Sequence, residues 1–265
     1  MATLYFNAAV NTNWDTNGNW WTDAAATEPG NKPTSADSAV ILASVASNSG
    51  GNPTIINLTV ATDGATVAGV TMTVTGVAAF SETSINNATI NGACTFSGTA
   101  TNSATITGAC TFSDTSYNNA GTINGDCTFS GDAYNSNGTI NGACTFSGSS
   151  YNNTGTINGA CTFSETSINN ATINGACTFG NGALNNGTIT GNCTFSGTAY
   201  NAGTITGNAI FTGTSYIASA GTITGTVRMS TLSAAKTIQT GLLADSSVST
   251  TVPNGINGSS ILGLP

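Results

Sequence analysis

The chain has 265 residues and a formal net charge of −8, with three basic residues and 5% charged residues in all. Average globular domains contain roughly one quarter charged residues, so Thr, Ser and Asn must keep this chain soluble. The scarcity of Lys and Arg argues against nucleic acid as a partner. Apolar runs stay well short of the ~20 residues of a membrane-spanning helix, so we expect no membrane span.

Residues 1–50 differ from the rest of the chain because they contain all three Trp residues. An aromatic cluster beside a repeat array is typical of a cap that covers the unpaired edge of the first repeat. The alternative is a Trp platform that binds a sugar. We expect no secretory signal peptide, because the first residues lack a positive and a long apolar region. The predicted cap or assembly residues are Leu4, Tyr5, Phe6, Trp14, Trp20 and Trp21.

Residues 51–244 repeat a unit close to Thr-Ile-Asn-Gly-Ala-Cys-Thr-Phe-Ser. Phe recurs every 16 or 17 residues from Phe80 to Phe211, and Ile recurs in the same way from Ile90 to Ile223. A fixed short period indicates a repeat architecture. Within each unit Ile, Cys and Phe alternate with polar residues at a period of two, which predicts strand and not helix.

We therefore predict an all-β fold, a single-stranded parallel β-solenoid (β-helix) with 16–17 residues per coil and about ten to twelve coils, capped by the aromatic segment. Coils would stack ~4.8 Å apart, so that equivalent side chains lie above one another. One coil buries too few apolar side chains to offset the entropy of ordering it, so its stability must come from its neighbours.

The side chains at three positions of the repeat should form internal ladders. The seven Cys are interpreted as small buried hydrophobes. Disulfides are disfavoured because in-register Cβ vectors run parallel, and zinc is disfavoured because it needs four converging ligands. The sequence thus predicts no cofactor and no metal. The ladder residues are Cys94, Cys110, Cys127, Cys144, Cys161, Cys177, Cys193, Phe96, Phe112, Phe129, Phe146, Phe163, Ile106, Ile123, Ile140 and Ile157.

Catalytic chemistry has few candidates in this sequence. There is no His, which excludes Ser-His-Asp and Cys-His arrangements. Asp114, Asp126 and Asp132 are interpreted as surface acids that maintain solubility, the alternative being a glycosidase carboxylate pair. We predict that the protein is not an enzyme.

The residues on either side of each repeat Ile point outward and form two parallel files. They are a possible binding face, and Thr-x-Thr files on a β-solenoid resemble ice-binding surfaces, from which the middle coils depart by carrying Asn. The alternative is ordinary solvent-facing strand residues. A further file of Asn follows the Tyr/Ile position and is predicted to be a turn ladder. The face is represented by Thr122, Asn124, Thr139, Asn141, Thr188, Thr190, Thr204 and Thr206.

Residues 245–265 are predicted to form a C-terminal cap or an assembly tail, with the apolar residues Ile261, Leu262 and Leu264 near the end. The apolar residues at the two ends of the chain have two possible roles. They can fold back on their own end coils and give a monomer. They can instead pack on the opposite end of the next copy and give a head-to-tail filament.

The order Asn-Trp-Trp, Pro-Thr-Ser-Ala-Asp, a Val-Ile strand and then Gly/Thr/Asn repeats resembles the start of β-solenoid proteins among bacterial surface adhesins and phage tail fibres. The resemblance implies a structural or attachment role in an extracellular fibre or virion. We therefore expect a non-enzymatic, fibre- or filament-forming subunit of a phage tail, virion appendage or bacterial surface that assembles end to end with itself. The alternatives are an adhesin that binds a cell-surface glycan and an ice-binding protein.

Overall fold

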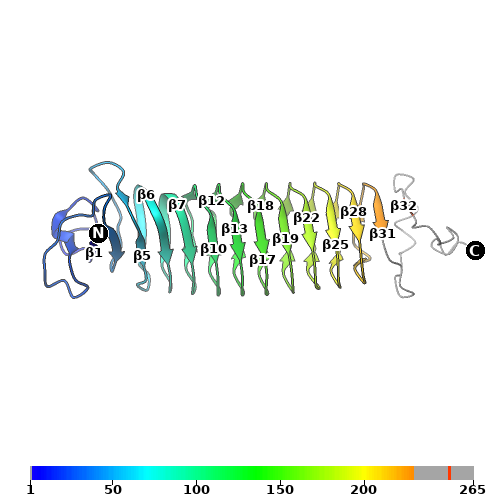
Figure 1. The fold of residues 1–265 in the computed structure, drawn as a ribbon, viewed down its shortest axis with the longest axis horizontal. Coiled ribbons are helices and arrows are strands. Elements are labelled where there is room, and N and C mark those ends of the chain that lie inside the picture. Colours follow the sequence, from blue (N-terminus) through cyan, green and yellow to red (C-terminus); the bar gives the residue numbers. More distant parts are fainter. Residues whose placement is uncertain (1, 230–249, 252–265) are drawn as a thin grey trace, which may run out of the picture. The chain divides into compact units, whose positions relative to one another are not determined.

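The computed structural model describes residues 2–229 and 250–251 of the chain (Figure 1). Parallel strands stack in a β-solenoid of about 11 turns, which confirms the predicted fold class. The chain divides into two compact units. The N-terminal unit comprises residues 1–128 and 132–142, and the C-terminal unit comprises residues 129–131 and 143–265. The division into cap, solenoid and tail at residues 50 and 244 stays a prediction.

The N-terminal unit begins with strands that join the same sheet as the repeats. Strand β1 (Thr3–Phe6) pairs in parallel with β3 (Ser38–Ile41), and β3 pairs with β5 (Leu58–Val60). Strand β2 (Trp20–Trp21) follows the short 3-10 turn η1 (Asn17–Asn19) and pairs antiparallel with β1. The first 50 residues therefore continue the solenoid sheet to its N-terminal edge, where β2 adds the antiparallel strand.

Two long strands lead into the regular coils. Strand β6 (Thr66–Phe80) pairs with β4 (Thr54–Ile55), with β5 and with β7 (Ile85–Phe96). The β6–β7 register shifts at two places, between Ala68 and Thr71 and between Thr73 and Val77. Each of these strands covers most of one coil, and the same path is broken into three short strands in later coils (Figure 1).

The first strand type of a regular coil follows the Cys-Thr-Phe motif. Its members are β10 (Cys110–Phe112), β13 (Cys127–Phe129), β16 (Cys144–Phe146), β19 (Cys161–Phe163), β22 (Cys177–Phe179), β25 (Cys193–Phe195), β28 (Ala209–Phe211) and β31 (Val227–Met229).

The second strand type has two residues and in most coils ends in Asn. Its members are β8 (Thr101–Asn102), β11 (Tyr117–Asn118), β14 (Tyr134–Asn135), β17 (Tyr151–Asn152), β20 (Ile168–Asn169), β23 (Leu184–Asn185), β26 (Tyr200–Asn201) and β29 (Tyr216–Ile217).

The third strand type is a Thr-Ile pair. Its members are β9 (Thr105–Ile106), β12 (Thr122–Ile123), β15 (Thr139–Ile140), β18 (Thr156–Ile157), β21 (Thr172–Ile173), β24 (Thr188–Ile189), β27 (Thr204–Ile205) and β30 (Thr222–Ile223). After β31 comes β32 (Thr250–Thr251), which pairs with it in parallel.

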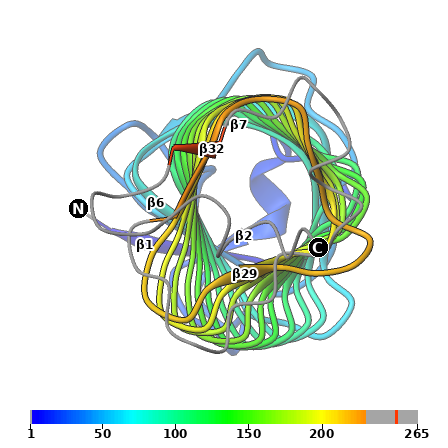
Figure 2. The same cartoon turned by 90° about the vertical axis from the view of Figure 1, so that its right-hand side faces the viewer.

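Identical residues stack because each strand pairs with its equivalent one repeat later. In the C-terminal unit Cys161 pairs with Cys177 and Phe163 with Phe179. The Phe rings lie parallel, with centroids 4.7 Å apart for Phe163 and Phe179, which is the spacing of neighbouring strands. Figure 2 looks along this stacking direction, and successive coils of a unit superpose.

The corner between the Thr-Ile and Cys-Thr-Phe strands brings two backbones close together. A Cβ added to Gly175 would lie 2.1 Å from the carbonyl oxygen of Gly159 in the preceding coil. This approach has no room for a side chain, so the Gly of the Thr-Ile-Asn-Gly motif is required by sterics. The described residues include no helix that is long and apolar enough to cross a membrane.

Candidate functional site

The aromatic residues of the N-terminal segment pack against one another inside their own unit. The side chains of Phe6, Trp14 and Trp20 are at most 1% exposed. The Trp14 and Trp20 rings meet edge to face with centroids 4.6 Å apart, and Trp20 Nε1 donates to the carbonyl oxygen of Trp14. Leu4 is buried, and Tyr5 and Trp21 are half-buried.

These positions fit a cap better than a sugar platform, because a platform needs an exposed ring face and the two buried Trp residues offer none. They also take Phe6, Trp14 and Trp20 away from any contact with a second copy. The apolar residues predicted at the other end, Ile261, Leu262 and Leu264, lie outside the described residues.

Carboxylates tie the loops of this segment together. Asp15 accepts hydrogen bonds from Lys32 Nζ at 2.7 Å and from the Ser49 and Gly50 N–H groups. Burial alone would raise the pKa of Asp15, but these hydrogen bonds outweigh it and the pKa lies below its usual value. Hydrogen bonds from the Thr34 side chain and the Ala2 N–H likewise lower the pKa of Asp37.

The predicted internal-ladder residues all lie inside the coils. Each of the seven Cys is buried and none forms a disulfide. The Phe and Ile ladder residues named above are at most 1% exposed. Among the described residues no group of three or more Cys, His, Asp or Glu side chains comes together in a way that could hold a metal ion.

The thiols interact along the file. Hydrogen bonds with Cys144 and Cys177 lower the pKa of Cys161 to about 5, although burial opposes this. The hydrogen bond with Cys161 and burial raise the pKa of Cys177. The physical cause is the same in both cases: a thiolate between two S–H donors is stabilised, and its neighbours then resist losing a second proton.

The possible binding face uses much of its hydrogen-bonding capacity internally. Asn124, Asn141, Thr190 and Thr206 are exposed, as is Thr188, whereas Thr122, Thr139 and Thr204 are half-buried. Asn141 Nδ2 donates to Asn124 Oδ1 at 2.8 Å, and Thr206 Oγ1 donates to the Thr190 carbonyl oxygen at 3.3 Å. These donors point along the stack, so the face is not a row of free hydroxyl groups that could order ice.

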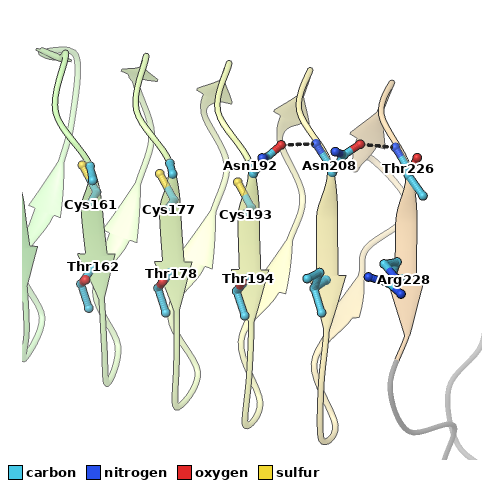
Figure 3. Close-up of a pocket in the computed structure, with 13 residues that line it drawn as sticks. Cys161, Thr162, Cys177, Thr178, Asn192, Cys193, Thr194, Asn208, Thr226 and Arg228 are labelled. Carbon is cyan, nitrogen blue, oxygen red and sulfur yellow. Dashed lines mark hydrogen bonds between the residues drawn. The ribbon is translucent and has the colours of Figure 1, made fainter.

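A second outward file was missed in the sequence. The Thr of each Cys-Thr-Phe strand points to solvent between two buried residues, as the burial of Thr162 and Thr178 illustrates. In the C-terminal unit this face forms a shallow groove of about 650 Å³. Thr178 and Thr194 lie on one side of it, Ala176 and Asn192 on the other, and Arg228 at one end (Figure 3). The period-two alternation around Cys and Phe was the signal for it.

The Asn file is fully buried and not a surface turn ladder. In the N-terminal unit Asn86 donates to Asn102 and Asn102 to Asn118, each at 2.8 Å. In the C-terminal unit the same chain of side-chain amides runs from Asn152 to Asn201. The hydrogen bonding along the stack agrees with the interpretation from sequence, but the amides are core groups.

The predicted acidic spot consists of side chains that face solvent. Asp114, Asp126 and Asp132 are all exposed. Asp114 sits in a turn with a φ of 57° and accepts a hydrogen bond from the Gly98 N–H of the preceding coil. This carboxylate thus joins neighbouring turns.

Comparison with known proteins finds no matching protein family, no matching curated protein and no matching solved structure.

Proposed function

We propose that this protein is a non-enzymatic structural subunit of a fibre on a phage tail, a virion appendage or a bacterial surface, and that copies assemble end to end. The observation that carries the proposal is the repetition of the interior: the Phe, Ile, Cys and Asn ladders make each coil the template for the next. Such an array transmits structure along its length. Its reactive groups, the thiols and amides, are buried in the ladders.

The join between copies would use the last regular coil. Strand β29 pairs with β26 and β30 pairs with β27. Among the described residues no strand covers their other edges. An open edge offers backbone donors and acceptors to another chain. The aromatic cap does not contribute its buried rings, so the contact would be made by backbone strands and by the outer surface of the cap.

The experiment is electron microscopy of purified full-length protein, with two variants of one strand. Ile217 is half-buried at the position that Asn occupies in the preceding coil, and Tyr216 beside it is 42% exposed. Ile217→Lys would place a charge where the next copy must stack, so fibres should disappear while the circular dichroism spectrum is kept. Tyr216→Lys, pointing outward on the same strand, is the control and should keep fibres. Full-length protein that stays monomeric at all concentrations contradicts the proposal.

A second candidate function is glycan binding in the groove of the Cys-Thr-Phe face. The observation in its favour is the row of hydroxyl groups beside small Ala side chains, closed at one end by Arg228. Hydroxyl and amide groups in a shallow groove suit a neutral sugar chain. Glycan-array binding that is lost in Thr178→Val but kept in Thr139→Val, on the other face, would support it. Equal binding by both variants would remove the groove from consideration.

A further inference from the structure

The file of Cys residues has a regular geometry that packing alone does not require. In the C-terminal unit Cys144 pairs with Cys161, Cys161 with Cys177, and Cys177 with Cys193. In the N-terminal unit Cys94 pairs with Cys110. Because equivalent side chains in parallel, in-register strands point the same way, successive sulfur atoms are separated by about one strand spacing, ~4.8 Å.

This spacing is unsuited to the usual partners of thiols. It is too long for an S–S bond of about 2 Å, and a single file cannot surround a tetrahedral ion. It does suit an ion that takes two sulfur ligands in a straight line. Two metal–sulfur bonds of roughly 2.3 Å each, the length found in zinc–thiolate sites, span ~4.6 Å. Soft thiolate ligands favour monovalent copper among biological metals.

The charges also balance. A monovalent ion M⁺ that enters the gap between two thiols forms two M–S bonds, one S–H bond breaks and one proton leaves to solvent. The ion takes the place of the proton between neighbouring sulfurs, so the buried file gains no net charge. The lowered pKa of Cys161 and that of Cys110, to about 5 through its hydrogen bonds with Cys127 and Cys94, favour loss of that proton near neutral pH.

A small ion can reach the file from the side. Cys161, Cys177 and Cys193 contribute to the lining of the groove on the Cys-Thr-Phe face. Figure 3 shows their sulfur atoms at equivalent places on successive strands. The thiols are 2–4% exposed, so entry does not require the coils to separate.

We propose that the Cys file binds soft monovalent cations, Cu⁺ or Ag⁺, with one ion in each gap between successive thiols. This binding does not depend on the fibre role proposed above, because it follows from the ladder within a single chain.

The test is to count Ag⁺ ions per chain by native mass spectrometry in chloride-free buffer. Replacing a thiol at the end of the file removes one gap, whereas replacing an inner thiol removes two. We expect Cys193→Ala to bind one ion fewer than the unmodified protein and Cys177→Ala two fewer. Thr178→Ala, which alters the groove and not the file, should bind the full number. Ala209 already stands at the Cys position of the next coil, so Ala is compatible with the fold there.

Proton release measured in the same titration should be one H⁺ per Ag⁺ bound. An equal loss of one ion in Cys177→Ala and Cys193→Ala would mean that thiols bind ions singly, and would overturn the proposal. So would an unchanged count in both variants, or full binding only after the coils unfold by circular dichroism.

Discussion

Asn169 is fully buried, and yet both ends of its side-chain amide are hydrogen-bonded. Its Nδ2 donates to Asn185 Oδ1 at 2.8 Å and to the Ala171 carbonyl oxygen at 3.0 Å. Its Oδ1 accepts from Asn152 Nδ2 at 2.9 Å and from the Ala171 N–H at 3.3 Å. A buried amide costs free energy only where it lacks partners, so this file is compatible with a stable core.

Replacing Asn169 with Ala should therefore leave amide groups of Asn152 and Asn185 without a partner. We expect the free energy of unfolding to fall by about 2–4 kcal/mol, because each orphaned buried polar group costs about 1–3 kcal/mol. Urea denaturation followed by circular dichroism measures the loss. The control is Asn170→Ala at the exposed neighbouring position, which should change stability by less than about 0.5 kcal/mol. Equal effects would show that burial of the amide is irrelevant.

Among the structural elements, the tightest constraint lies in the corner before each Cys-Thr-Phe strand. The backbone of Gly175 approaches that of Gly159 so closely that a Cβ would overlap the carbonyl oxygen. Backbone atoms cannot move aside as a flexible side chain would. The corner thus fixes how near two coils can lie, and any side chain there forces them apart.

Gly175→Ala should consequently destabilise the C-terminal unit by about 3 kcal/mol or more, since it overpacks a rigid contact and disturbs the pairing on both sides. Gly180→Ala is the matched control, because a Cβ there would meet only Ser196 Oγ at 3.5 Å. It should be neutral or slightly stabilising, by up to about 1 kcal/mol. Thermal unfolding of the two variants compares them directly. A tolerated Gly175→Ala would contradict the sterically closed corner.

The N-terminal segment should be more sensitive to acid than the coils. Asp15, Asp23 and Asp37 have pKa values below the usual 3.8 because hydrogen bonds favour their charged forms. As the pH falls, the unfolded segment takes up protons first. The stabilisation is therefore complete well above pH 3.8 and is lost as the pH drops through 3.8 toward the lower folded values.

Trp fluorescence measures this loss, because all three Trp residues lie in this segment. We expect a fluorescence change below about pH 3.8 while the circular dichroism of the coils persists. Asp37→Asn, which no longer titrates, should weaken the pH dependence. Simultaneous loss of both signals would show that the segment and the coils unfold as one.

Much of this could be predicted from sequence at the level of elements. The alternation around Cys94 and Phe96 gives strand, parity and stacking, because side chains in a strand alternate faces. The buried Asn file followed from the same parity, since Asn118 comes directly after the outward Tyr117. It was taken for a turn feature because polar residues are usually exposed. The groove depends on small Ala176 lying beside Thr178 across coils, which a single repeat does not reveal.

The cap could not be decided from the sequence pattern. Trp14 and Trp20 are apolar enough to fold back or to bind another copy, and only the packing distinguishes these outcomes. The chain path explains the result: β2 runs antiparallel to β1, and this pairing carries Trp20 back over the first coil.

At the scale of the whole molecule, each coil contacts only its neighbours, and equivalent residues occupy equivalent places. Stability is then close to a sum over coils and the interfaces between them. Removing one complete coil should leave all remaining contacts matched.

Deleting residues 164–179 joins Phe163 to Gly180 and removes one period of 16 residues. We expect a folded protein with an unchanged circular dichroism spectrum per residue and a melting temperature lowered by a few degrees. Deleting residues 164–171, half a coil, should prevent folding of the C-terminal unit, because Thr-Ile would then stand where a turn is needed. Similar behaviour of the two deletions would contradict coil-by-coil stability.

The Asn files also give the stack an electrical direction. Every side-chain amide donates toward the following coil, so the amide dipoles within each unit add head to tail, as peptide dipoles do in a helix. In the C-terminal unit the series ends where Ile217 replaces Asn opposite Asn201. A protein made of nearly equal coils is therefore not equivalent at its two ends: the side where the amide series begins presents oxygen, and the side where it stops presents N–H groups. An array of such units would carry polarity as a filament of oriented dipoles does, with growth at one end chemically distinct from growth at the other.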